Sequence, residues 1–242
     1  MIRSISVALG ILTLLAAAPA AAGPPFITDD PEPTDVRHWE IYAFGDGQGE
    51  SSSVDADAGL DLNYGAIRDV QLTATLPLSF EHDRESGWRG GTGDLELAVK
   101  YRFLHDEKSG VSAAVFPRAF LPTSTLQGRG RAKLLIPIWL QKNWGPTSLF
   151  GGGGYEINPG SENRDFWQEG AAVTHDFGNG FTAGVEIAHQ GSDSNGGTGE
   201  TDAGAGVIVH LSGIASLLAS GGPTWADHRT GYHFYASLGL NF

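Results

Sequence analysis

Apolar and polar residues alternate one by one along much of this chain. The clearest case is Thr230–Phe242, where two sets of side chains fall on opposite faces of an extended strand. One face carries Tyr232, Phe234, Ala236, Leu238, Leu240 and Phe242, and the other carries His233, Tyr235, Ser237, Gly239 and Asn241. A strand with lipid on one side and a polar lumen on the other has this pattern. We therefore interpret the segment as the closing strand of a transmembrane β-barrel.

The same alternation predicts an all-β chain of about twelve strands in an up-and-down antiparallel barrel. The predicted strands are Val36–Asp46, Ser53–Tyr64, Arg68–Glu81, Gly93–Phe103, Val111–Leu121, Ala132–Asn143, Thr147–Glu156, Asp165–Phe177, Phe181–Gln190, Thr201–Leu211, Ile214–Ser220 and Thr230–Phe242. Most offer about ten residues, the length that a tilted strand needs to cross a bilayer. The fifth, seventh and eleventh are weaker, because they are apolar on both faces, glycine-rich or short. A barrel of ten strands is therefore the alternative count.

Short and long connections follow one another in turn between these strands. We expect short turns at Gly65–Ile67, Leu104–Gly110, Trp144–Pro146, Gly178–Gly180 and Ser212–Gly213. We expect longer loops at Gly47–Ser52, His82–Thr92, Pro122–Arg131, Ile157–Arg164, Gly191–Glu200 and Gly221–Arg229. Bacterial outer-membrane barrels have short periplasmic turns and longer outside loops. The pattern thus predicts a bacterial outer-membrane location with both termini in the periplasm. A soluble β-sandwich or lipocalin-like barrel is the alternative fold.

The start of the chain divides into two segments that precede the barrel. Residues 1–22 combine Arg3, an apolar run and a small-residue cleavage site, which is typical of a signal peptide. Residues 23–35 are rich in proline, which cannot donate to a β-ladder. This segment either trails in the periplasm or enters the lumen as a plug. The barrel itself is expected over residues 36–242.

Composition narrows the chemistry that the chain can carry. It has no cysteine, which excludes disulfides, thiol catalysis and cysteine metal sites. Its formal net charge of −13 and the lack of a basic patch argue against nucleic-acid binding. The eight histidines show no metal-ligand spacing, so we expect neither a metal nor a cofactor. An acidic chain suits exposed loops or a lumen that favours cations.

The polar face of the predicted strands is the expected working surface. The candidate pore-lining residues are Asp94, Glu96, Lys100, Arg102, Arg118, Lys133, Glu186, His233 and Tyr235. Charged side chains there can form a constriction that selects solutes. They can equally pair across strands and stiffen a closed barrel. The sequence leaves open both a channel and a closed structural or adhesive barrel.

Two segments resemble known outer-membrane proteins. The last strand, with Tyr232, Phe234, Leu238, Leu240 and Phe242 on one face, resembles the C-terminal signal that the barrel-assembly machinery recognises in Gram-negative barrels. The stretch Pro25–Tyr42 resembles the opening of a barrel family named after the meta-pathway of phenol degradation. The second resemblance implies a transporter that passes small, often aromatic or apolar, molecules by passive diffusion. Outer-membrane lipid is then expected to surround the barrel.

An outer-membrane lipid hydrolase is the enzymatic alternative. His210 and Ser212 have the spacing of the histidine and serine in the outer-membrane phospholipase. They lie at a predicted short turn, whereas the phospholipase site faces the outer leaflet. We therefore expect a rim histidine beside a turn serine and no catalytic residues.

Overall fold

The computed structural model describes residues 25–126 and 130–242, and their regular structure is entirely β. The predicted signal peptide lies outside these residues. The strands are β1 (Trp39–Gly49), β2 (Ser53–Ile67), β3 (Val70–Asp83), β4 (Gly87–Thr92), β5 (Leu95–Asp106), β6 (Val111–Val115), β7 (Arg118–Leu121), β8 (Lys133–Trp144), β9 (Thr147–Ile157), β10 (Phe166–Asp176), β11 (Phe181–Gln190), β12 (Glu200–His210), β13 (Ala215–Ala226) and β14 (Arg229–Asn241). Within the described residues, no helix is long and apolar enough to cross a membrane.

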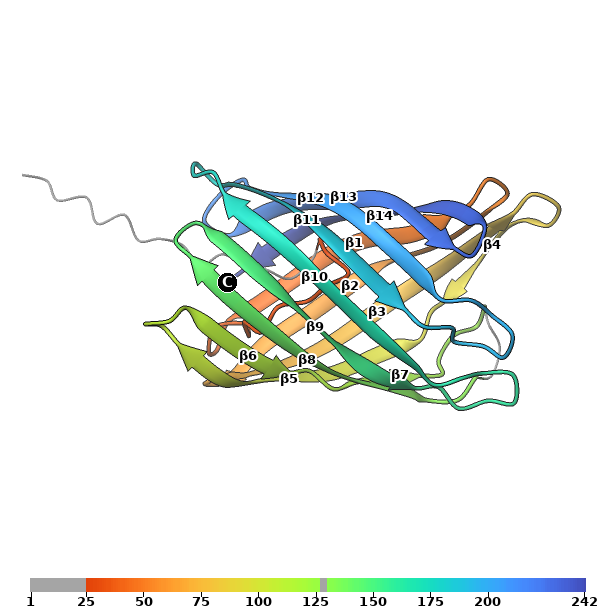
Figure 1. The fold of residues 1–242 in the computed structure, drawn as a ribbon, viewed down its shortest axis with the longest axis horizontal. Helices are drawn as coiled ribbons and strands as arrows, with labels where there is room; N and C mark the ends of the chain where they lie inside the picture. Colours follow the sequence, from red (N-terminus) through yellow and green to blue (C-terminus); the bar gives the residue numbers. More distant parts are fainter. Residues whose placement is uncertain (1–24, 127–129) are drawn as a thin grey trace, which may run out of the picture.

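The strands close into an antiparallel barrel with twelve strand positions around its wall, which we call staves (Figure 1). Both β6 and β7 pair with β5 and β8, so together they form one stave, while β4 extends a hairpin from β3. Pairing of β1 with β14 closes the ring. At the seam, Trp39 and Phe242 exchange backbone hydrogen bonds of 2.8 and 3.0 Å. The predicted fold class and strand number are confirmed, and the ten-strand alternative is wrong.

Two prolines explain why the fifth stave is split. Pro117 separates β6 from β7 and lacks the N–H that a ladder needs. The backbone N–H of Phe116 instead donates to Pro137 on β8 at 3.1 Å, and Val99 on β5 donates to the carbonyl of Pro117 at 3.1 Å. Phe116 keeps the inward parity of Ala114, Arg118 and Phe120, so its ring lies in the lumen, where it is 5% exposed. Alternation is hard to recognise in Val111–Leu121 because the apolar residues Ala114, Phe116 and Phe120 occupy inward positions.

The other two weak segments are regular strands. Gly151–Gly154 lies in β9 and pairs in register with β8 and β10. Leu217 and Leu218 lie in β13, with Leu217 exposed on the outside and Leu218 buried inside. Backbone hydrogen bonds to two neighbours hold a strand in place even where side chains are few. Propensity and pattern are weak guides to such strands.

The barrel has two unlike ends. We call the rim of short turns, where β1 begins and β14 ends, the turn end, and the opposite rim the loop end. Three predicted long loops are wrong: β1 and β2 are joined by residues 50–52, His82–Thr92 is largely the β3–β4 hairpin, and β13 and β14 are joined by Asp227 and His228. The strands continue beyond the apolar zone, and their polar residues there look like loop residues in the sequence.

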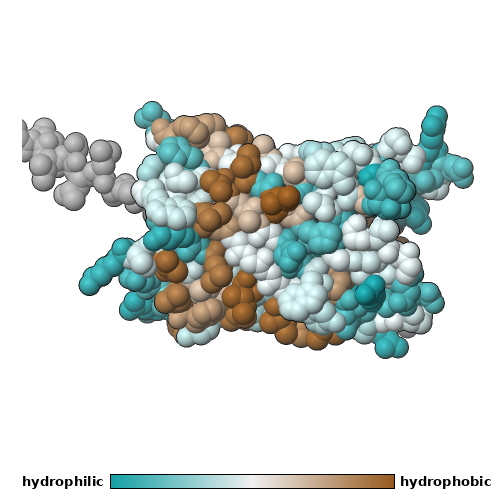
Figure 2. All heavy atoms as spheres, in the orientation of Figure 1, coloured by the Kyte–Doolittle hydropathy of each residue, from teal (hydrophilic) through white to brown (hydrophobic). Residues whose placement is uncertain are grey.

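The outer surface is apolar over the body of the barrel. Hydrophobic side chains gather in a band nearer the turn end, with hydrophilic residues at both rims (Figure 2). Outward leucines and valines such as Leu76, Leu140 and Val185 are 48, 53 and 59% exposed. The predicted assembly-signal residues all point outward: Tyr232, Phe234, Leu238 and Leu240 on β14, and Phe242 directly after it. Such a surface is suited to lipid rather than water.

A charge placed in this band tests whether it faces lipid. Val185→Arg on β11 is expected to lower the free energy of unfolding in bilayers by roughly 2–4 kcal/mol, because the guanidinium would lie in hydrocarbon. Urea unfolding in lipid vesicles measures the effect. The control is Glu169→Arg, on the outward face of β10 near the loop end, where roughly 1 kcal/mol or less is expected. Equal effects at both positions would contradict a lipid-facing band.

Candidate functional site: the barrel lumen

A cavity of about 920 Å³ occupies the lumen. It reaches from Glu81 and Asp193 near the loop end to Gln71 and Lys100 in the turn half. Inward side chains of the strands form its walls, because alternate residues of every strand point inside. The cavity ends against the N-terminal segment, which lies within the barrel. Its lining therefore decides what the lumen can accept.

Carboxylates dominate the lining. They are Asp29, Glu32, Glu40, Asp46, Asp55, Asp57, Asp61, Glu81, Asp94, Glu96, Asp193, Glu200 and Asp202. Asp46 on β1 and Asp57 on β2 lie directly opposite each other in the ladder, an arrangement of like charges. One buried oxygen of Asp46 has no hydrogen-bond partner among the described residues. This wall of β1 and β2 gives the cavity a negative potential.

The opposite wall is basic and aromatic. Arg118 on β7 forms a bidentate pair with Glu96 on β5, with N–O distances of 2.7 and 2.8 Å. Its guanidinium also lies over the rings of Phe116 and Phe120, at 5.7 and 5.6 Å from their centroids. Lys133 on β8 is 5.2 Å from the centroid of Phe120. These basic groups are thus held by carboxylate and ring contacts rather than free in the cavity.

The N-terminal segment Pro25–Asp35, which we call the luminal plug, crosses the turn half of the lumen. On one side, the backbone N–H groups of Ile27 and Thr28 donate to Glu186 on β11, both at 3.1 Å. On the other side, the N–H of Thr34 donates to Gln71 on β3 at 2.8 Å. Figure 1 shows the segment inside the ring of strands. Of the two predicted placements, the structure has the luminal one.

Ion pairs hold the middle of the plug. Lys100 on β5 lies 3.0 Å from Asp29 and 3.6 Å from Asp30, and Arg102 pairs with Glu32 and, at 2.6 Å, with Asp69. Asp30 is fully buried, and burial raises its pKa well above the usual value, while the Lys100 ammonium opposes that rise. The plug therefore depends on β5 for its electrostatic partners.

Glycines form the seat of the plug on β10–β12. A Cβ added at Gly170 would collide with the Thr28 hydroxyl. A Cβ at Gly184 or Gly206 would come within 3.0 or 2.9 Å of the Phe26 ring. Only a wall without side chains leaves space for the plug here. The ring of Phe26 also packs edge-to-face on Phe150 of β9, with 6.1 Å between centroids.

The structure places the nine predicted pore-lining residues in two groups, all on inward positions. Those that border the cavity are Asp94, Glu96, Lys100, Arg118, Lys133, His233 and Tyr235. Arg102 and Glu186 instead lie against the plug. Asp94 precedes β5 rather than lying within it, and accepts a hydrogen bond from the Ser124 backbone at 2.9 Å.

Sequence reasoning missed the acidic wall and the glycine seat. Asp55, Asp57 and Asp61 share the polar parity of their strand, so the alternation could have identified them. The inward glycines also fall on the polar parity, yet glycine frequency by itself suggested only turns. Phe116 shares the inward parity of Arg118, but an aromatic residue at that position looks like a lipid-facing one in the sequence.

The candidate catalytic pair does not assemble. His210 Nδ1 lies 2.8 Å from the hydroxyl of Ser216, while the Ser212 hydroxyl accepts from the N–H of Ile214 at 3.3 Å. Both His210 and Ser212 are exposed at the turn end. No group of three or more potential metal ligands comes together within residues 25–126 and 130–242.

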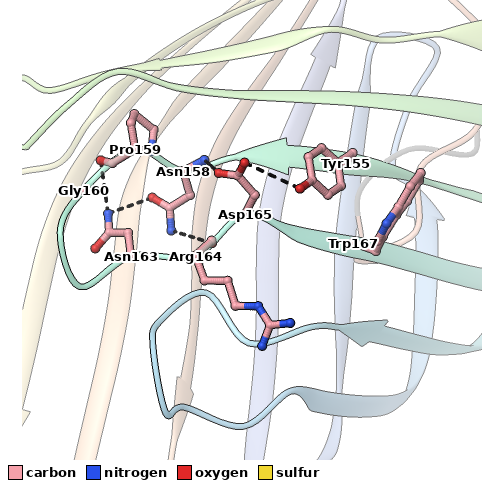
Figure 3. Close-up of a pocket in the computed structure, with 8 residues that line it drawn as sticks. All are labelled: Tyr155, Asn158, Pro159, Gly160, Asn163, Arg164, Asp165 and Trp167. Atoms are coloured by element: carbon pink, nitrogen blue, oxygen red, sulfur yellow. Dashed lines mark hydrogen bonds between the residues drawn. The ribbon is translucent and has the colours of Figure 1, made fainter.

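A second, shallower pocket of about 560 Å³ lies at the loop end, between β9 and β10 (Figure 3). Asp165 accepts a hydrogen bond from the Asn158 backbone at 2.8 Å, and Asn163 donates to the Asn158 side chain at 3.0 Å. The rings of Tyr155 and Trp167 flank it, 5.2 Å apart. The amide and carboxylate groups here bond to one another, so the pocket is part of a stable loop.

Comparison with known proteins gives matches in structure only. No protein-family model and no curated protein sequence matches the chain. It is similar to an outer membrane channel from Pseudomonas putida F1, with a TM-score of 0.76 and 13% identity over 88% of this chain and 98% of that one. It is also similar to the NanC porin (TM-score 0.59, 8% identity, 84% of this chain, 98% of that one) and to the translocator domain of autotransporter NalP from Neisseria meningitidis (0.56, 13%, 84%, 88%). These likenesses show the fold, which is that of outer-membrane barrels.

The two kinds of charge contact in the lumen predict stability changes of opposite sign. Glu96→Gln is expected to lower the free energy of unfolding by about 1–3 kcal/mol, because the partly buried Arg118 loses a charged partner. Asp46→Asn is expected to raise it by about 0.2–1 kcal/mol, because the repulsion from Asp57 disappears. Urea unfolding measures both, with the exposed Glu85→Gln as a control of no effect. A loss of stability in Asp46→Asn would contradict the like-charge interpretation.

Proposed function

We propose that this protein is an outer-membrane channel through which small molecules diffuse passively, with a preference for cations, including aromatic ones. The observation that carries the proposal is the luminal cavity with its excess of carboxylates. Carboxylate-lined pores favour cations, since the charge replaces part of the hydration that an ion loses on entry. In this proposal the turn end faces the periplasm.

The aromatic side chains of the lining support the organic part of the preference. Tyr42 and Phe44 lie between Glu40 and Asp46 along the inward face of β1, and Tyr235 lies opposite Asp46 on β14. Ring faces attract cations, and adjacent carboxylates add a charge-assisted partner. A neutral apolar solute would contact the rings but would also have to displace water from the carboxylates. The lining therefore favours organic cations over neutral hydrocarbons.

A closed structural barrel is the competing function, and the plug is the observation that favours it. With the plug in place, the cavity ends within the turn half of the lumen. Passage through the barrel thus requires that the plug yields, at least transiently. Conductance separates the two functions, because a closed barrel carries no current.

Ion selectivity tests the channel. In planar bilayers with a salt gradient, the reversal potential of the intact protein is expected to show preference for potassium over chloride. The double variant Asp46→Asn, Asp57→Asn is expected to reduce that preference by roughly two- to fivefold, because each carboxylate contributes about 1 kcal/mol or less in a hydrated lumen. Glu85→Gln, which removes one carboxylate outside the lumen, serves as the control. Anion preference in the intact protein would contradict the proposal, as would the absence of current from both the intact protein and a variant with a weakened plug.

A further inference from the structure

We propose that the luminal plug is a gate: it inhibits passage by occupying its seat in the turn half of the lumen, and its release opens a continuous path. The inference rests on the proposed channel function. It assigns to Pro25–Asp35 a role beyond filling space, and it assigns to Lys100 and Arg102 the role of holding the closed state.

The plug bridges opposite walls of the barrel. Its first part lies against β11 and β13, where Glu186 binds its backbone and the Ser220 hydroxyl donates to the carbonyl of Pro25. Its last part reaches Gln71 on β3. Thr28, Asp30 and Pro31 are fully buried between these walls. A segment that spans the lumen from wall to wall obstructs whatever would pass along it.

The wall behind the plug is bare. Gly170, Gly184 and Gly206 present no side chain to the lumen, and their neighbours Phe26 and Thr28 fill the space instead. The cavity already borders Pro25, Phe26 and Ile27 on the other side of the plug. If the plug leaves, no strand residue at these three positions can occupy the seat. The existing cavity would then extend toward the turn end.

The contacts that hold the plug are of a kind that can open without unfolding the barrel. Its backbone donors at Ile27, Thr28 and Thr34 bond to side chains rather than joining the β-ladder. Ion pairs of Lys100 and Arg102 add electrostatic contacts, and the Phe26 ring packs on Phe150. The side chains of the ion pairs are only 5 to 24% exposed, so salt screens the pairs little while the plug is seated, and the pairs weaken when water enters around them. Every stave keeps its two ladder partners whether or not the plug is seated.

A reversible covalent lock tests the gate directly. Because the chain has no cysteine, the double variant Thr28→Cys, Gly170→Cys contains a single pair of thiols, placed where the two side chains meet. After oxidation, checked by gel mobility with and without reductant, bilayer conductance is expected to fall at least about tenfold and to recover on reduction, since the lock removes the open population. Because a side chain at position 170 collides with the seated plug, the reduced double variant and Gly170→Cys are expected to be more open than the intact protein. Each single-cysteine variant is the matched control and should not respond to oxidant.

Weakening the ion pairs provides a second test that needs no disulfide. The variant Asp29→Asn, Glu32→Gln is expected to raise the ratio of open to closed time about tenfold, which corresponds to about 1.4 kcal/mol. Asp35→Asn removes the same kind of charge from an exposed position of the plug and should change the ratio less than about twofold. Raising the salt concentration should increase opening only modestly in the intact protein, because the seated pairs are largely buried, and less still in the double variant.

The outcomes separate this inference from the channel proposal. Current that is equal in the locked, reduced and charge-weakened proteins would overturn the gate and leave the channel intact. Current in none of them would overturn the channel itself. Current that follows reduction of the lock and loss of the ion pairs would support both.

Discussion

Satisfaction of backbone hydrogen bonds across an apolar layer is the constraint on which this structure depends. Hydrocarbon offers no partner to an open strand edge, so the sheet must close on itself. Here β1 and β14 pair along their length, and the exchange between Trp39 and Phe242 completes the seam at the turn end. Closure then forces the alternation of the sequence, because each strand has one face toward the outside and one toward the lumen. The break at Pro117 is tolerated because neighbouring carbonyls accept the displaced donors.

The same constraint gives the lumen polar walls, and side chains or another segment of the chain must fill the space between them. Twelve staves enclose more space than their own side chains occupy, and the structure uses two different solutions. Near β5–β8, long side chains such as Arg118 and Phe116 extend inward and contact each other. Near β10–β12, several inward positions are glycines without side chains, and the plug occupies the space that they leave. The barrel is therefore asymmetric across its axis, with a charged and aromatic wall facing a bare one.

The fold was largely predictable from the sequence, and the site only in part. Period-two alternation follows from two unlike surroundings, so it predicted the staves, the strand count and the outward face of Thr230–Phe242. It failed for the ends of strands that extend beyond the apolar zone, because a polar strand and a polar loop have similar compositions. The inward parity predicted Lys100, Arg102 and Glu186, but their bonds to a distant N-terminal segment have no local signature. Contacts between residues so far apart in the chain depend on the closed three-dimensional form.

Acidic side chains of the plug belong both to the ion pairs that hold the plug and to the lining of the cavity. The cavity is rich in carboxylates, yet the plug is itself acidic and settles where Lys100 and Arg102 supply positive charge. Asp29 and Glu32 of the plug also border the cavity, so a cation that enters it meets the carboxylates that hold the plug in place. A cation bound there competes with Lys100 and Arg102 for the same oxygens, which weakens the seated state. Since linkage is reciprocal, a solute that favours the released plug must bind more tightly when the plug is released. On this argument the charge that selects the solute is the charge that opens its path.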